Sequence, residues 1–197
     1  MSTFLENRSN VEPETRQYFA QKTDEIGITP EEMENLRVSL SKSSPMSETL
    51  DICAERVGPS NVKQVAVMLL HLVRHGVGMP THVGTANFVA RLCRSAGGAF
   101  KRYASKLIKP ALEHLCSPSS AIRKAYAGTL AAIASIVPSS HTSALLVELR
   151  RLYCEKGELL HRQATIVTLQ ALAHAATVKL KDNNVDCVPL AFLGTCD

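Results

Sequence analysis

The sequence contains no tryptophan, and aromatic residues make up only 5% of its 197 positions. Sheet sandwiches rely on aromatic and β-branched side chains. Hydrophobic residues nevertheless account for 45% of the chain, which is enough for a buried core. A core that is poor in rings and rich in alanine favours helices that pack at short distance.

The sequence also lacks a long apolar run. The longest stretch, residues 65–73, is interrupted by His71 and is too short to span a bilayer. The N-terminus reaches a charge at Glu6 before any apolar run forms, which is not the pattern of a secretory signal peptide. We therefore expect no transmembrane segment, and residence in the cytoplasm, the nucleus or both.

Motifs that carry catalysis or metal binding are missing. No C-x-x-C pair occurs, and His71 and His75 supply only two ligands without the Glu of a zinc-protease motif. Residues 76–78 and 97–98 are glycine-rich but follow helical patterns, so they indicate helix ends and turns. We expect no catalytic residue, cofactor, metal or small-molecule substrate. Three cysteines lie in apolar helical patterns and are expected to be buried, reduced thiols: Cys93, Cys116 and Cys154.

Acidic residues are absent from residues 56–112, a stretch with nine lysine and arginine side chains. The whole chain has a net charge of +4, whereas residues 1–50 carry nine acidic and five basic side chains. This asymmetry favours an acidic partner for the later part of the chain. Nucleic acid is disfavoured, because single-strand binders stack bases on aromatic rings and few rings accompany the basic residues.

What the sequence does contain is a repeat. Ala86, Ala125 and Ala164 recur at one constant interval, and the residues three and seven positions after each are small or apolar. A helix that returns about every 40 residues predicts an α-solenoid of the HEAT or armadillo type. The predicted fold class is all-α, an α-α superhelix of about four helix pairs with the last pair incomplete. Solenoids build extended surfaces that hold other proteins.

Proline, glycine and serine divide the chain into segments. Residues 1–43 are expected to form an N-terminal segment, with residues 1–10 disordered and a short helix over 11–24. Thr29 and Glu32, on either side of Pro30, predict a helix that starts with a capping box. HEAT-like repeats are expected after this segment, at about 45–79, 80–117, 118–157 and 158–197.

Within the repeats, the apolar spacing predicts individual helices. The last one is expected to start near Asp186. Because an unfinished repeat exposes the apolar face of its neighbour, we expect the chain to be a piece of a longer protein or a truncated product. The other predicted helices are 46–57, 62–76, 80–97, 101–116, 119–137, 140–155 and 159–176.

Five basic residues form a candidate binding site, which we call the basic strip. Arg102, Lys106 and Lys109 are spaced i, i+4, i+7 on a second helix, and Arg150 and Arg151 on the next second helix extend them. Second helices line the concave side of HEAT arrays, so the strip is expected to contact an acidic protein surface. An ordinary solvated face is the alternative. Exposed charge pairs contribute only about 0–1 kcal/mol each, although aligned charges steer a partner.

Other arginines are expected to have structural roles. Arg123 and Arg162 lie near the starts of first helices, where HEAT-repeat arginines pair with an acid of the neighbouring repeat. One repeat interval after Arg91 and Arg94, the sequence has a leucine and an isoleucine. The first full repeat is therefore expected to pack differently from the next.

Four segments go beyond a generic repeat: SPMSETLDIC (44–53), RHGVGMPTHVGTANFV (74–89), YASKLIKPALEHL (103–115) and VPLAFLG (188–194). They resemble, in order, the family of large HEAT-repeat proteasome adaptor and scaffold proteins. The resemblance implies a non-catalytic scaffold that binds the 26S proteasome, through subunits of its core and regulatory particles, and supports its assembly or stability. It also implies cytoplasmic and nuclear residence. The alternative is a basic helical-repeat module that binds nucleic acid or another acidic protein.

Overall fold

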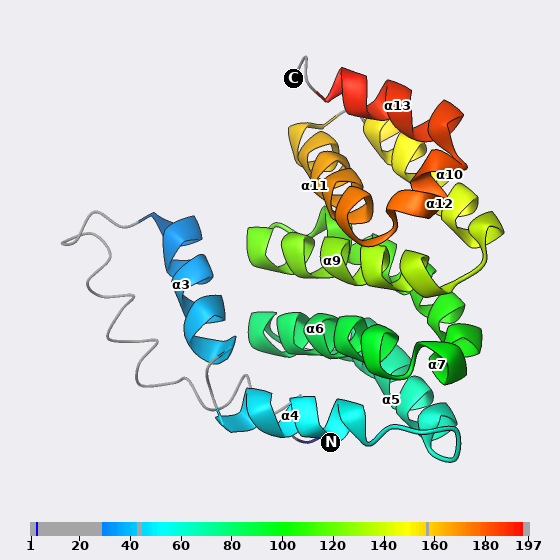
Figure 1. The fold of residues 1–197 in the computed structure, drawn as a ribbon. Coiled ribbons are helices and arrows are strands. Elements are labelled where there is room, and N and C mark those ends of the chain that lie inside the picture. The colour runs from blue at the N-terminus through cyan, green and yellow to red at the C-terminus, as the bar shows by residue number, and fades with distance from the viewer. Residues whose placement is uncertain (1–2, 4–28, 43–44, 157, 195–197) are drawn as a thin grey trace.

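The structure, a computed structural model, describes residues 3, 29–42, 45–156 and 158–194. Regular structure within these ranges is helical, and no strand occurs in them (Figure 1). The helix expected over 11–24 lies outside the described residues, as do residues 1–10 apart from Thr3.

The repeats form a stack of helix pairs, which confirms the all-α HEAT-type superhelix. The first helices pack successively, α4 on α6, α6 on α9 and α9 on α11 (Figure 1). A second-helix segment follows each of them. After α3 (Pro30–Lys42), the first helices are α4 (Pro45–Glu55), α6 (Met79–Ser95), α9 (Ser120–Ile136) and α11 (Leu159–Ala175). The second-helix segments are α5 (Val62–His75), then α7 (Gly97–Ala104) with η1 (Ser105–Leu107), α8 (Ile108–Glu113) and η2 (His114–Cys116), then α10 (Ser139–Lys156), and finally α12 (Thr177–Lys181) with α13 (Asn184–Leu193).

Two second-helix segments differ from the prediction. The expected turn at residues 97–98 is wrong, because α7 already begins at Gly97 and Ala96 alone forms the connection. The segment is then interrupted by the 3-10 turn η1. Pro110 follows in the first turn of α8, where a missing N–H is tolerated because the first N–H groups of a helix have no intrahelical partner. In the last pair, the additional helix α12 precedes α13, which begins two residues before the expected Asp186.

Glycine ends α5, the second helix of the first pair, as expected. Gly76 caps α5 through an N–H bond of 2.8 Å to the Leu72 carbonyl oxygen. Gly78, before α6, has φ 84°, the one positive φ among the described residues. Glycine adopts this conformation at little cost because it has no Cβ.

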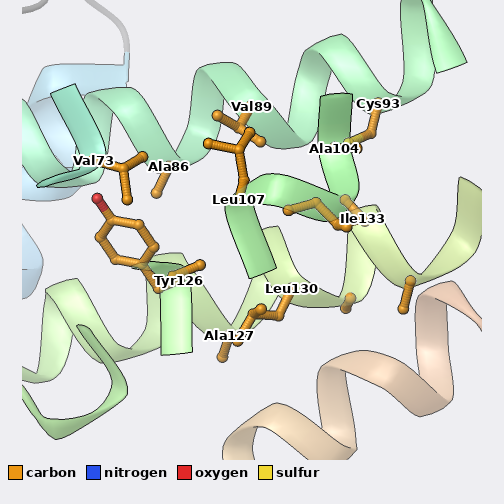
Figure 2. Close-up of a cluster of buried hydrophobic side chains, with 14 of the residues drawn as sticks. Val73, Ala86, Val89, Cys93, Ala104, Leu107, Tyr126, Ala127, Leu130 and Ile133 are labelled. Atoms are coloured by element: carbon orange, nitrogen blue, oxygen red, sulfur yellow. The ribbon is translucent and has the colours of Figure 1, made fainter. Parts of the chain in front are cut away.

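The interior is aliphatic and rich in alanine. Ala86 is 0% exposed and Ala164 is 1% exposed, whereas Ala125 lies at the edge of the core. Figure 2 shows Ala86 and Val73 beside Tyr126 of α9, the largest of the fully buried side chains.

Unequal repeat lengths place Ala86 and Ala125 at different positions of their helices. The interval between the starts of α6 and α9 is longer, by two positions, than the interval between the starts of α9 and α11. Ala86 therefore corresponds to Ala127, which is 1% exposed. By the same correction Arg91 corresponds to Ala132 rather than to the leucine that the constant spacing suggested. The expectation that the first full repeat packs differently rested on that constant spacing.

Hydrogen bonds join each repeat to the next, and in each case the two bonded residues lie about one repeat length apart in the sequence. Thr129 donates to the Ala86 carbonyl oxygen at 2.8 Å, and Ser95 donates to the Ala54 carbonyl oxygen at 3.1 Å. Lys179 of α12 donates to carbonyl oxygens at the end of α9, at 2.6 Å from Ala134 and 2.9 Å from Ser135, and also to that of Val137. A cation at these carbonyls satisfies acceptors that the helix leaves open and complements its dipole.

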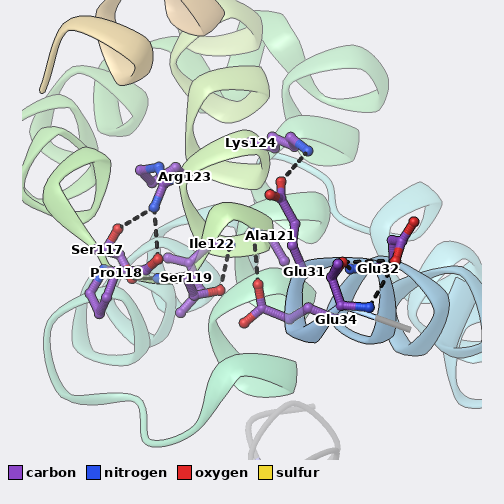
Figure 3. A network of polar contacts seen from close by, with 11 residues as sticks. Glu31, Glu32, Glu34, Ser117, Pro118, Ser119, Ala121, Ile122, Arg123 and Lys124 are labelled. Carbon is purple, nitrogen blue, oxygen red and sulfur yellow. Dashed lines mark hydrogen bonds and ion pairs between the residues drawn. The ribbon is translucent and has the colours of Figure 1, made fainter. Parts of the chain in front are cut away.

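Helix α3 begins as predicted and rests on the start of α9. The capping box is confirmed, since Thr29 N–H donates to Glu32 at 2.8 Å and Glu32 N–H donates to the Thr29 hydroxyl at 3.2 Å. Figure 3 shows Glu34 pointing to the first turn of α9, where it accepts from Ala121 N–H at 3.3 Å. Glu31 pairs with Lys124 at 3.4 Å. The acidic N-terminal segment therefore contacts the positive end of a helix dipole.

Arg123 differs from the expected pairing with an acid of the neighbouring repeat. Its guanidinium donates to the carbonyl oxygens of Ser117 and Pro118, each at 2.8 Å, in the connection between η2 and α9. Arg123 thus caps the end of the preceding segment, because its helix starts directly after those carbonyls. The guanidinium of Arg162 lies over the ring of Tyr153, 5.6 Å from its centroid.

The cysteines fall into three environments. Cys93 is 2% exposed, as predicted, and burial raises the pKa of its thiol to about 12. Cys116 is half-buried, and the prediction of a buried Cys154 is wrong because its side chain is exposed. Cys154 directly follows Tyr153, the last residue of the buried stripe of α10, and therefore points to the outer side.

Enlarging the alanine at the centre of the stack should destabilise the fold. We expect Ala86→Leu to lower the free energy of unfolding by about 1–3 kcal/mol, because a fully buried site between packed helices has no room for the added carbons. Urea unfolding followed by circular dichroism measures the change. The exposed neighbour supplies the control, Asn87→Leu, which should change stability by less than about 0.5 kcal/mol. Equal effects of the two substitutions would contradict the packing argument.

Thiol reactivity should follow these environments. In the native protein at about pH 8, iodoacetamide should alkylate Cys154 and leave Cys93 unmodified, because the thiolate is the reactive form. Peptide mass mapping before and after addition of urea identifies the modified thiols. Alkylation of Cys93 in the native protein would show that its surroundings open readily.

Candidate protein-binding surface

The structure separates the basic strip into two groups. Arg102 lies on α7, Lys106 on η1 and Lys109 on α8, and all three side chains are exposed. None of them forms an ion pair with another residue in the described part of the chain. They follow the predicted order along one segment, but the segment is not a continuous α-helix.

The two arginines of α10 are already paired with acids. Arg150 lies 3.5 Å from the Asp186 carboxylate of α13. Arg151 donates to Glu148 from Nε at 3.0 Å and from Nη2 at 2.8 Å, and this contact raises the pKa of the guanidinium. The positive charge available to a partner is therefore concentrated on Arg102, Lys106 and Lys109.

A pocket of about 630 Å³ adjoins Lys109, with walls from α8 and α10. Its apolar lining includes Ile108 and Leu112 from α8 and Leu145 and Leu152 from α10. Charged side chains stand at its rim. The sequence pattern placed the basic residues on one segment, but nothing in the pattern predicted this pocket, because its second wall lies in the next repeat.

A smaller pocket of about 390 Å³ lies on the first-helix side, between α4, α6 and α9. Small side chains of α6 and α9 line it together with Arg91, Arg94 and Lys124. Arg91 is paired with Asp51 of α4 at 2.5 Å, and Lys124 is paired with Glu31 of α3. Most of its positive charge is thus balanced within the chain.

The densest cluster of titratable rings is structural. The half-buried His82 of α6 and His114 of η2 meet the buried Tyr126 of α9, with the ring centroids of His114 and Tyr126 4.3 Å apart and stacked. His82 Nδ1 lies 3.2 Å from the Tyr126 hydroxyl, and His114 Nε2 lies 2.6 Å from the Val73 carbonyl oxygen. Burial lowers the pKa of His82, and the adjacent His114 adds to this effect, whereas the Gly76 backbone opposes it. The sequence did not predict this cluster, because its three members are far apart along the chain and come from three different elements.

Metal clusters and membrane-spanning helices are both missing from the described residues. No group of three His, Cys, Asp or Glu side chains there is placed to hold a metal ion. His71 and His75 lie with their ring centroids 4.9 Å apart on the exposed side of α5. None of the described helices combines the length and the apolar character needed to cross a membrane.

Comparison with known proteins gives one consistent family. Residues 1–154 match the family described as proteasome adapter and scaffold protein ECM29, HEAT-repeat domain. The human proteasome adapter and scaffold protein ECM29 is 30% identical over 190 residues, which is 96% of this chain and 10% of that protein. The Schizosaccharomyces pombe proteasome component ecm29 is 25% identical over 138 residues, covering 70% of this chain and 8% of that protein.

A Drosophila melanogaster relative, the proteasome-associated protein ECM29 homolog, is 22% identical over 162 residues, 82% of this chain and 8% of that protein. The chain thus spans a tenth or less of the length of the curated relatives it matches. No solved structure matches the chain.

Acid should destabilise the fold through His82. Because its pKa is lowered in the folded protein, the unfolded chain binds a proton near the ordinary value of 6.5, while the folded chain binds it only at lower pH. The stabilisation is therefore complete above about pH 6.5 and is lost as the pH falls through the folded pKa.

We expect the wild-type free energy of unfolding to decrease between about pH 7.5 and pH 5.5, and this decrease to be smaller in the variant His82→Phe. Urea unfolding at the two pH values measures it. His174 is exposed and provides the control, since His174→Phe should keep the wild-type decrease. Identical pH dependence in both variants would remove His82 as the cause.

Proposed function

This chain belongs to the HEAT-repeat family of the proteasome adapter and scaffold protein ECM29, and we propose on that premise that it is a non-catalytic section of a scaffold that binds the 26S proteasome. The observation that carries the proposal is the match of residues 1–154 to a domain of proteins named as proteasome adapters and scaffolds. The stacked helix pairs are consistent with it, because such stacks present long surfaces to other proteins.

The names of the relatives support a scaffold role, from which a finer proposal is made. We propose that the chain contacts subunits of both the core and the regulatory particle, and supports proteasome assembly or stability. Since proteasome binding requires the two to meet, we also propose that it resides in the cytoplasm and the nucleus. Imaging of the tagged chain together with a proteasome subunit tests this residence, and exclusion from both compartments would contradict it.

Charge supports a specific contact surface. Arg102, Lys106 and Lys109 project from one segment without an ion-pair partner among the described residues, so they are available to an acidic protein surface. Arg150 and Arg151 are expected to contribute less, because part of their charge is balanced by acids of this chain. Complementary charge across an interface accelerates association and fixes its register.

Charge reversal on this segment should weaken proteasome binding. We expect the double variant Lys106→Glu with Lys109→Glu to recover purified 26S proteasomes roughly tenfold less well than the wild-type chain, because both charges then repel an acidic surface. Quantitative pull-down at several salt concentrations measures recovery.

The matched control reverses two other exposed lysines, Lys63→Glu with Lys181→Glu, and changes the net charge equally. Equal recovery of both double variants would remove the strip as the contact surface. Failure of the wild-type chain itself to bind purified proteasomes would contradict the proposed function.

A further inference from the structure

We infer that the pocket between α8 and α10 is a docking groove for an acidic amphipathic helix of a partner protein. We call it the α8–α10 groove. Its lining includes Ile108, Lys109, Leu112, Ala144, Leu145 and Leu152. The inference rests on the proposed function in one respect, since the docked helix would belong to a proteasome subunit.

The shape of the groove suits a helix. On the α8 side and on the α10 side, the lining positions recur every three or four residues, so each wall is one face of a helical segment. A third helix fits between two such walls by placing its own apolar positions into the space between them. The volume of about 630 Å³ falls within the range of roughly 300–1,000 Å³ that is typical of binding sites.

The local backbone leaves this space open. The 3-10 turn η1 interrupts the segment that forms the first wall, and Pro110 lies in the first turn of α8 that follows it. On the opposite wall, the exposed Ala144 offers only a methyl group where a larger side chain would fill the groove. Ile108, Leu112 and Leu152 are only partly buried, so their apolar surface is available to an occupant.

The charged residues at the rim of the groove favour an occupant with negative charge. On the α10 side, Glu148 and Arg151 satisfy each other at 2.8 Å and offer little net charge. On the other side Lys109 has no ion pair within the described residues, and Lys106 and Arg102 continue from it along the chain. Acidic residues are missing from 56–112, so carboxylates of an incoming helix would be the partners of these cations.

Glu113, one turn beyond Lys109, also lines this wall, on the side away from Lys106 along the segment. The carboxylates of the occupant are therefore placed towards the Lys109 and Lys106 side of the groove. A basic helix would meet Lys109 there, with Lys106 and Arg102 farther along the same segment, so the groove discriminates against it by like-charge repulsion.

A synthetic helix tests the inference with the purified chain. The probe is a fluorescein-labelled peptide of about 18 residues with leucines at i, i+3, i+4 and i+7 and glutamates on its other face. One comparison peptide replaces the glutamates with lysines, and another keeps the composition but scatters the leucines. Fluorescence anisotropy should show at least about tenfold tighter binding of the probe than of either comparison peptide.

Filling the groove separates docking from simple charge attraction. Ala144→Arg adds a positive charge but occupies the space, so it should weaken binding of the acidic probe by about tenfold. The control is Ala173→Arg, at another exposed alanine, which lies on α11 outside the groove and should bind like the wild type. Unchanged or tighter binding by Ala144→Arg would overturn the inference, because it would indicate surface charge alone.

The rim charge is tested in the same assay. Lys109→Glu should weaken binding of the acidic probe and strengthen binding of the lysine peptide, whereas Lys63→Glu, on α5 and outside the groove, should change neither. Equal binding of acidic and lysine peptides by the wild-type chain, or no binding of the probe, would also overturn the inference.

Proteasome recovery distinguishes this inference from the proposed function. If the peptides behave as expected but the wild-type chain does not bind purified proteasomes, the groove stands and the proposed function fails. If the chain binds proteasomes and the probe does not bind, the docking inference is wrong and the proposed function is unaffected. Reduced proteasome recovery with Ala144→Arg, and not with Ala173→Arg, would support both.

Discussion

Close contact between successive first helices is the constraint on which the whole structure depends. Small side chains such as Ala86 and Ala127 let α6 and α9 approach, and the larger Leu130 and Ile133 fill the space beside them. Because each pair is covered only by its neighbours, the stack needs contacts that recur from repeat to repeat. Hydrogen bonds between neighbouring repeats supply some of them, including those from Ser95 and Lys179 to backbone carbonyl oxygens.

The same stacking produces the candidate binding surface. Second-helix segments of neighbouring repeats stand side by side without filling the space between them, and this space is the α8–α10 groove. Charge balance across repeats then decides which cations remain available. Arg150 is paired with an acid of the following repeat, while Lys109 is not paired within the described residues.

Much of the fold was predictable, and the errors have identifiable causes. Thr29 with Glu32 marked a helix start because a capping box is a local motif. The turn expected at Gly97 was wrong because glycine permits a turn without requiring one. The assumption of a constant repeat length matched Ala86 and Arg91 to the wrong residues of α9, since the interval from α6 to α9 is longer than the interval from α9 to α11. Cys154 was misassigned because it lies one position past the buried stripe of its helix.

By itself, the sequence determined the helical class, the approximate repeat length, the aliphatic interior and the excess of positive charge over residues 56–112. These properties follow from spacing along the chain, which sets the faces of each helix. Only the tertiary structure decided that His82 meets His114 and Tyr126, that Arg151 is balanced by Glu148, and that a groove separates α8 from α10. Such contacts depend on the rotation and offset between neighbouring helices and on side-chain geometry, which small differences in repeat length alter without changing the apolar pattern.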